Sequence, residues 1–352
     1  MPDTFSDKQV AASPRLKMSD IAALAGVSVS TVSRALAGNS LIPQRLRERI
    51  EELAENHGYA VNHAARNLRL QKTQTIGIVV PVPAEMSQSL TDPLLLQMIG
   101  HLTEEISQRG YDLLLRKINA PQKGWLQSLI QSHRFDGLLV LGHGGQQAAL
   151  QETASKYLPM VVWGERATQS AYCTVGIDNV QAGRTATEHL ISIGRKAIRF
   201  LGPAAKTPEV ESRYRGYVEA ISLSGLSMNT APVTCQLTHV SAYEAVRALL
   251  QAGEPFDALF CASDIVANAA RMALTEARLR IPDAVALVGF DDVPMAQTLS
   301  PPLTTIRQDP GVAANLLVEM LFRRMAGQST PANLFPARLI VRQSSVGTAL
   351  FS

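Results

Sequence analysis

Beyond Lys72 the chain alternates short apolar segments with longer amphipathic ones. Short runs rich in Val, Ile and Leu that are bounded by turn residues indicate buried strands, whereas apolar residues at helical spacing indicate helices. The predicted strands are 76–81, 111–115, 137–141, 160–163, 197–201, 258–261 and 285–290. The predicted helices are 94–109, 122–133, 146–156, 180–193, 212–224, 242–251 and 265–277. This α/β alternation predicts parallel sheets that are covered by helices on both faces.

The predicted strands and helices are too many for one small sheet. We therefore expect two α/β subdomains with a cleft between them, within a core that spans 74–352. The first subdomain is expected at about 74–175 and 301–330, and the second at about 176–300 and 331–352. The chain is expected to cross back to the second subdomain near Phe335.

The stretch from Met18 to Leu36 has a different pattern, which predicts two short helices joined by a tight turn. Ser19 can cap the first helix, and Asp20 in its first turn suits the positive end of the helix dipole. Gly26 falls at the turn, where a residue that adopts positive φ at little cost is favoured. The apolar face of the first helix is expected to consist of Ile21, Leu24 and Ala25.

Ser28 is expected to cap the second helix, on which Val32 and either Ala35 or Leu36 point inward. The outward side chains of this helix are Val29, Ser30, Thr31, Ser33 and Arg34. Hydroxyls bond phosphates or base edges, a valine can contact a thymine methyl, and an arginine can bind guanine or a phosphate. The pair of helices is typical of a helix-turn-helix, although an ordinary pair of surface helices gives the same pattern.

A third helix is predicted at about 43–57, and it ends at Gly58. Its apolar face is expected to consist of Leu46, Ile50, Leu53 and Ala54. This face would complete a three-helix head with its own small core. A short basic segment follows at 62–72, and the composition then changes abruptly to the apolar run at 76–81.

The order of these segments resembles the lactose-repressor (LacI/GalR) family of bacterial transcription regulators, through to the end of the chain. The most specific part of the resemblance is AGVSVSTVSR at 25–34. Two departures concern Pro43, where many relatives have Ser or Thr, and Val61, where many have Pro. The resemblance implies a core similar to periplasmic binding proteins. It also implies a flexible tail at 1–16, a helix-turn-helix domain at 17–60 and a hinge helix at 61–73.

The resemblance further implies roles for individual residues in DNA binding. Val29 and Ser30 would read bases at the start of the recognition helix. The remaining contacts of the head are expected from Ser19, Thr31, Ser33 and Arg34. In the hinge, leucines of two subunits would wedge into the minor groove and kink the duplex. The matching hinge residues are Asn62, Ala65, Arg66 and Leu68.

Composition and charge agree with a small basic head on a large core. The chain has 352 residues and 46% hydrophobic content, which suffices for a sizeable core. Residues 1–72 contain ten Lys or Arg against seven Asp or Glu, which accounts for the whole net charge of +3. A positive surplus in the head fits attraction to phosphates and a salt-dependent affinity for DNA.

Ligands of open α/β sheets bind outside the carboxyl ends of strands, so polar residues at those ends are candidates for an effector site. Trp163, Ser263 and Asp291 end or follow predicted strands, and Arg213 opens a helix. The resemblance implies that Arg213 and Asp291 bind sugar hydroxyls and that Asp92 faces the ligand from the first subdomain. A structural role is the alternative, since Asp291 could cap a turn and Trp163 could belong to the core.

Catalytic, metal and cofactor sites are not expected. The sequence has no HExxH or GxSxG motif, and the GHGG run at 142–145 matches no phosphate-binding motif, so we expect a tight turn there. Cys173, Cys235 and Cys261 are widely spaced, which favours buried thiols over a metal or redox site. The absence of a secretory signal and of about 18 consecutive apolar residues predicts a cytoplasmic, nucleoid-associated protein without a membrane partner.

The sequence therefore predicts a ligand-gated transcription regulator that is not an enzyme. Family members that form tetramers carry a leucine-rich C-terminal helix, whereas the C-terminal segment of this chain is polar and has no further heptad run, so a homodimer is expected. The homodimer is expected to bind pseudo-palindromic double-stranded operator DNA. An α-glucoside-, maltose- or sucrose-type sugar is expected to change the subdomain angle, melt the hinge helix and release the operator. One alternative is a corepressor-dependent regulator of another small metabolite. The other is a sugar-binding transport component, against which the DNA-binding head argues.

Overall fold

The structure, a computed structural model, describes most of the chain and divides it into two compact units. The units are Met1–Lys72 and Thr73–Ser352. The described residues are 16–36, 39–57, 59, 72–83, 89–165, 171–203, 207–227 and 229–347. Nearly all of the tail expected at 1–16 and of the hinge expected at 61–73 lies outside these residues.

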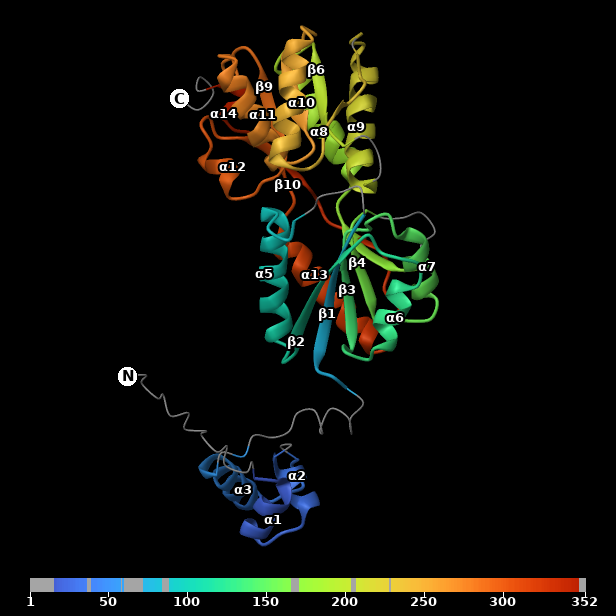
Figure 1. The fold of residues 1–352 in the computed structure, drawn as a ribbon, viewed down its shortest axis with the longest axis vertical. Coiled ribbons are helices and arrows are strands. Elements are labelled where there is room, and N and C mark those ends of the chain that lie inside the picture. The colour runs from blue at the N-terminus through green and yellow to red at the C-terminus, as the bar shows by residue number, and fades with distance from the viewer. Residues whose placement is uncertain are drawn as a thin grey trace, which may run out of the picture. The chain divides into compact units, whose positions relative to one another are not determined.

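Three short helices enclose a small apolar core in the first unit, as the sequence predicts (Figure 1). The helices are α1 (Met18–Ala25), α2 (Val29–Leu36) and α3 (Gln44–Asn56). Gly26 ends α1 with a φ of 67°, and the Ser28 hydroxyl accepts the Thr31 N–H at the start of α2. The side chains that are fully buried between the helices are Ile21, Val32, Ala35 and Ile50.

Two details of α1 correct the sequence prediction. The N-terminal cap is Lys17 rather than Ser19, and the Lys17 N–H donates to the Asp20 carboxylate at 2.8 Å. The helix begins earlier than expected because an acidic side chain in its first turn satisfies the free backbone donor at the cap. Leu24 is 47% exposed and does not face the core, where Ala22 is buried instead.

The first subdomain of the second unit is a parallel sheet with the strand order β11-β5-β4-β3-β1-β2. Its strands are β1 (Thr75–Val82), β2 (Asp112–Asn119), β3 (Gly137–Leu141), β4 (Met160–Trp163), β5 (Cys173–Gly176) and β11 (Asn333–Leu334). One face packs against α5 (Pro93–Ser107) and α13 (Pro310–Met325), and the other against α6 (Trp125–Gln131) and α7 (Gln147–Ala154). Successive strand residues point to opposite faces, so Ile78 and Val79 belong to different apolar clusters.

The second subdomain is a sheet with the strand order β12-β10-β9-β8-β6-β7, in which β10 and β12 are antiparallel and the other pairs parallel. Its strands are β6 (Ile198–Gly202), β7 (Val233–Thr234), β8 (Ala258–Cys261), β9 (Ala286–Asp291), β10 (Thr304–Arg307) and β12 (Arg338–Ile340). Its helices are α8 (Asn179–Ser192), α9 (Pro208–Ser224), α10 (His239–Gln251), α11 (Asp264–Glu276), α12 (Met295–Thr298) and α14 (Gln343–Val346). Residues of α8 and α9 share an apolar cluster on one face, and residues of α10 and α11 share another.

The two sheets confirm the predicted α/β core with two subdomains, and the chain crosses between them three times. The crossings fall at 177–178, 308–309 and 335–337. The return expected at 301 occurs only after Arg307, because β10 pairs with β9 in the second sheet. The crossing expected near Phe335 is confirmed. The boundary expected at 331 falls after Leu334 instead, because β11 pairs with β5 in the first sheet.

Candidate functional site

Helix α2, which was predicted to be the recognition helix, is buried on one side and open on the other. Val29 is 46% exposed, Ser30 and Arg34 are also exposed, and Thr31 and Ser33 are half-buried. These are the five residues of α2 that were predicted to contact DNA. A helix anchored by one face can place the other in the major groove.

The other predicted DNA contacts lie outside α2. Ser19 is exposed on α1, where its hydroxyl donates to Asp20 at 3.3 Å. Pro43, one of the two departures from the family pattern and not a predicted DNA contact, directly precedes α3 and makes no side-chain capping bond. The hinge residues Asn62, Ala65, Arg66 and Leu68 lie outside the described residues, so their roles stay predictions.

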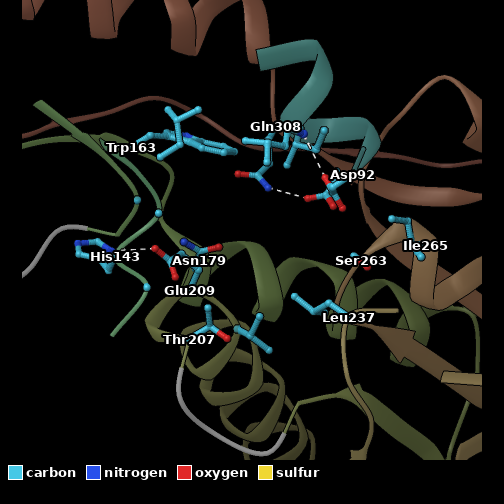
Figure 2. A pocket seen from close by; sticks show the side chains of 18 of the residues that line it. Asp92, His143, Trp163, Asn179, Thr207, Glu209, Leu237, Ser263, Ile265 and Gln308 are labelled. Atoms are coloured by element: carbon cyan, nitrogen blue, oxygen red, sulfur yellow. Dashed lines mark hydrogen bonds and ion pairs between the residues drawn. The ribbon is translucent and has the colours of Figure 1, made fainter. Parts of the chain in front are cut away.

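All five residues predicted to bind an effector line one cavity in the second unit (Figure 2). Asp92 and Trp163 come from the first subdomain, whereas Arg213, Ser263 and Asp291 come from the second. The cavity has a volume of about 310 Å³. Sites for small molecules typically measure roughly 300–1,000 Å³, so this volume suits a small compound.

Arg213 places a guanidinium group at the cavity, and neighbouring side chains and a backbone carbonyl hold this group in position. Its Nε donates to Asn179 Oδ1 at 3.0 Å, and its Nη1 donates to the carbonyl of Ala262 at 2.7 Å. The guanidinium carbon lies 3.6 Å from the centre of the Phe290 ring, which is a cation–π contact. The third nitrogen, Nη2, can donate to a ligand.

Two glycines allow the close helix contact that places Arg213 beside α8. A Cβ on Gly216 would lie 2.0 Å from the carbonyl oxygen of Val180, and a Cβ on Gly183 would lie 2.2 Å from the carbonyl oxygen of Arg213. No side chain fits at either position, so the backbones of α8 and α9 touch. This contact brings Asn179, the first residue of α8, within hydrogen-bonding distance of Arg213.

Asp291 ends β9 with a φ of 113°, a backbone conformation that L residues rarely adopt and that often marks functional sites. Its Oδ1 accepts a hydrogen bond from Gln308 Nε2 at 2.7 Å. Burial raises the pKa of Asp291 to about 7, against the opposing charge of Arg213 and with a further increase from nearby Asp92. The carboxyl can therefore change its charge near neutral pH.

Two more carboxyl groups lie in this region. Asp92 caps α5 by accepting the Leu95 N–H at 3.1 Å, and burial raises its pKa. Asp264 is fully buried and accepts hydrogen bonds from the Val293 N–H and the Thr305 hydroxyl at 2.9 and 2.6 Å. Burial and then the charge of Asp291 raise the pKa of Asp264 well above its usual value. Of these two, Asp92 lines the cavity together with Asp291, whereas Asp264 does not line it.

The last two predicted residues combine cavity lining with a structural role. Trp163, the final residue of β4, is half-buried and packs against the apolar core as well as the cavity. Ser263 caps α11, since its hydroxyl accepts the Val266 N–H at 3.3 Å. Trp163 therefore fits the structural alternative considered for it, and Ser263 has a capping role that the sequence analysis did not consider, while both residues still line the cavity.

The sequence prediction did not include His143, Glu209 and Gln308, which also line the cavity. His143 Nδ1 lies 2.9 Å from Glu209 Oε1, so the two side chains join the first subdomain to the second (Figure 2). A signal for Glu209 was available, because the Thr207-Pro208-Glu209 start is typical of a helix N-terminus. No sequence pattern indicated Gln308 as a cavity residue, because it lies in the segment at 308–309 where the chain crosses between the subdomains.

Other kinds of site find little support in the described part of the chain. Glycines 142, 144 and 145 have φ values of 82°, 53° and 71°, which fits the predicted tight turn. The described residues contain no group of three or more His, Cys, Asp or Glu that could hold a metal ion. The three cysteines are buried and free, as expected. No described helix is long and apolar enough to span a membrane.

The head and the cavity together define a class of protein, the DNA-binding regulator that responds to a small molecule. Residues 17–62 match the model of the bacterial regulatory proteins of the lacI family, and residues 187–345 match a periplasmic binding protein-like domain. The repressor CytR of Escherichia coli K12 is 30% identical over 334 residues, which are 93% of this chain and 96% of CytR. The chain belongs to the lacI family of bacterial transcription regulators.

Solved structures agree with this assignment. A lac repressor dimer bound to operator and the anti-inducer ONPF has a TM-score of 0.84 over 95% of this chain and all of that chain. At 22% identity, this likeness concerns the fold. A complex of the regulator CelR with cellobiose has a TM-score of 0.68 and 27% identity, over 94% of this chain and all of that chain.

Proposed function

We propose that this regulator represses carbohydrate-utilisation genes and is released from its operator by a small sugar. The observation that carries this proposal is the convergence of Asp92, Trp163, Arg213, Ser263 and Asp291 on one cavity. Sugars present apolar ring faces and hydroxylated edges, which suit an indole ring surrounded by carboxyl and guanidinium groups. The cellobiose in the CelR complex supports a glucoside, and our candidates are α-glucosides, maltose and sucrose.

The cavity lies where both subdomains contribute side chains, so a bound sugar would favour one arrangement of the subdomains over another. Operator affinity changes only if the sugar binds the two arrangements unequally. We infer that the change reaches DNA through melting of the hinge helix at 61–73. The active form would be a cytoplasmic homodimer on a pseudo-palindromic site, with α2 of each subunit in the major groove.

A titration of labelled operator DNA tests this function. Fluorescence polarisation of a degenerate palindromic pool would be followed at fixed salt, alone and with maltose, sucrose, cellobiose or a galactoside. Release by one of these sugars would support the proposal, and tighter binding would indicate a corepressor instead. Binding that no sugar alters would contradict the sugar-responsive part and leave the DNA-binding part standing.

A further inference from the structure

Glu209 is a carboxylate of the cavity that the proposed function does not yet use. It lies in the first turn of α9, where its side chain is 17% exposed. Its Oε1 accepts a hydrogen bond from His143 Nδ1 at 2.9 Å and lies 3.4 Å from the backbone nitrogen of Glu165. Both contacts use the same oxygen, and the backbone N–H of Glu209 itself is a third donor to the carboxylate. A carboxylate has about four acceptor sites, so this group can still accept a hydrogen bond from a molecule in the cavity.

His143 restricts the orientation of this carboxylate. The ring is 2% exposed and lies in the glycine-rich turn after β3. Because a carboxylate only accepts hydrogen bonds, Nδ1 must carry the proton that it shares with Glu209. A Cβ on Gly164 would lie 2.6 Å from both Glu209 Oε1 and the His143 ring, so the backbone packs tightly against the pair. Glu209 therefore has little freedom to turn away from the cavity.

Carboxyl groups lie on both sides of the cavity. Glu209 and His143 are on one side, and Asp92 and Gln308 are on the other (Figure 2). Burial opposes ionisation of Glu209, but the hydrogen bond and charge of His143, a hydrogen bond from the backbone of Glu209 itself and the charge of Arg213 outweigh burial, so that the pKa of Glu209 is lowered. Among the described lining residues, Arg213 stands against the carboxyl groups of Asp92, Glu209 and Asp291.

We propose that Glu209, positioned by His143, is a ligand-binding residue that selects an uncharged, hydroxyl-rich effector and rejects its phosphorylated form. This inference rests on the proposed function, because it assumes that the effector occupies this cavity. A sugar hydroxyl donates to Glu209 Oε2. An ionised phosphate at the same place only accepts hydrogen bonds, and in a largely buried site its charge is repelled by the carboxylate.

Calorimetric titration with matched pairs of compounds tests this selectivity. The pairs are ribose and ribose 5-phosphate, sucrose and sucrose 6-phosphate, and maltose and maltose 6-phosphate. The wild-type protein is expected to bind one uncharged member at least tenfold more tightly than its phosphate. E209Q is expected to bind the uncharged compound about ten- to hundredfold more weakly, as for a lost hydrogen bond to a charged group, and to discriminate less against the phosphate.

His143 is tested as a positioning residue with two substitutions. H143L removes the hydrogen-bond donor to Glu209 and should weaken binding of the uncharged compound. The effect should be strongest at low pH, because without His143 the pKa of Glu209 rises and its carboxylate is protonated at a higher pH than in the wild type. The groups that face Glu209 there are His143, Glu165, Tyr172 and Arg213, and Arg215 pairs with Glu165. H143N keeps an N–H donor near the position of Nδ1 and should restore most of the affinity and the wild-type pH profile.

The control is E104Q, which breaks the exposed pair of His101 and Glu104, 3.7 Å apart and far less buried. Operator affinity without effector reports folding of every variant. Wild-type affinity in E209Q, or tighter binding of a phosphate than of its uncharged partner, would overturn this inference while leaving the sugar-responsive regulator intact. Failure of the wild-type protein to bind any uncharged compound would overturn both.

Discussion

Asp291 is an acidic residue whose charge is set by its surroundings more than by its own chemistry. The folded protein holds its pKa near 7, whereas an unfolded chain would have a value near 3.8. The folded state therefore binds more protons between these values, so the contribution of this group to stability is present at low pH and is lost as pH rises towards 7. The expected loss is on the order of 4 kcal/mol.

D291N removes this titration while keeping an oxygen that can accept from Gln308. Its free energy of unfolding, measured by urea denaturation, should fall less between pH 5 and pH 8 than that of the wild type. D112N, at an exposed carboxyl on the edge strand β2, should follow the wild-type profile. Parallel profiles for D291N and the wild type would show that Asp291 does not titrate in this range.

Arg34 lies on the exposed face of helix α2, the predicted recognition helix, and does not belong to the apolar core of the head. R34A should therefore weaken operator binding, by about 1–3 kcal/mol if the guanidinium reads a guanine. Binding to non-operator DNA should fall much less, and the affinity for the effector should not change. An equal loss on operator and non-operator DNA would assign Arg34 to a phosphate contact instead.

Single residues of the site could be predicted where one strand end implied one position. Trp163, Ser263 and Asp291 were found in this way, whereas Arg213 was found from a helix start and Asp92 from the family resemblance. All five line the cavity. His143, Glu209 and Gln308 were missed because each acquires its role from a partner distant in sequence. A pattern read along one segment carries no information on such a partner.

At the scale of elements, the close contact of α8 and α9 decides where the arginine of the cavity lies. G216A would force a Cβ against the carbonyl of Val180 and separate the two helices. Overpacking of this kind costs about 1–3 kcal/mol of stability, and effector affinity should fall with it. The measurements are thermal unfolding and calorimetric titration.

G100A is the matched control, because Gly100 lies within helix α5 and a Cβ there would meet nothing within 4 Å. This variant should be neutral or more stable by about 0.5–1 kcal/mol, since alanine favours a helix over glycine. Full stability and full effector affinity in G216A would show that the helices can separate without consequence.

Elements with strong internal periodicity were predicted well, and those defined by pairing were not. The seven predicted strands are all present, yet β5, β7, β10, β11 and β12 were missed. The last two of these are a two-residue and a three-residue strand, too short for any alternation to show. Helix α13 was also missed, although the sequence held a signal for its start, since Asp309 caps the helix and Pro310 begins it.

At the scale of the whole molecule, the division after Lys72 predicts that the two activities can be separated. A fragment of residues 73–352 should bind the effector with wild-type affinity, because all lining residues of the cavity lie within it. The same fragment should show no operator binding in a gel shift. Loss of effector binding in this fragment would mean that the core depends on the head for its fold.

The three crossings also determine when the protein can fold during its synthesis. The first sheet is covered by α13 and completed by β11, which are made only after the segment from α8 to β10 of the second subdomain. Until then the nascent chain carries a sheet with one apolar face incompletely covered, a state prone to aggregation. A prematurely terminated chain would therefore yield an intact DNA-binding head on a core that cannot close, rather than a smaller working repressor.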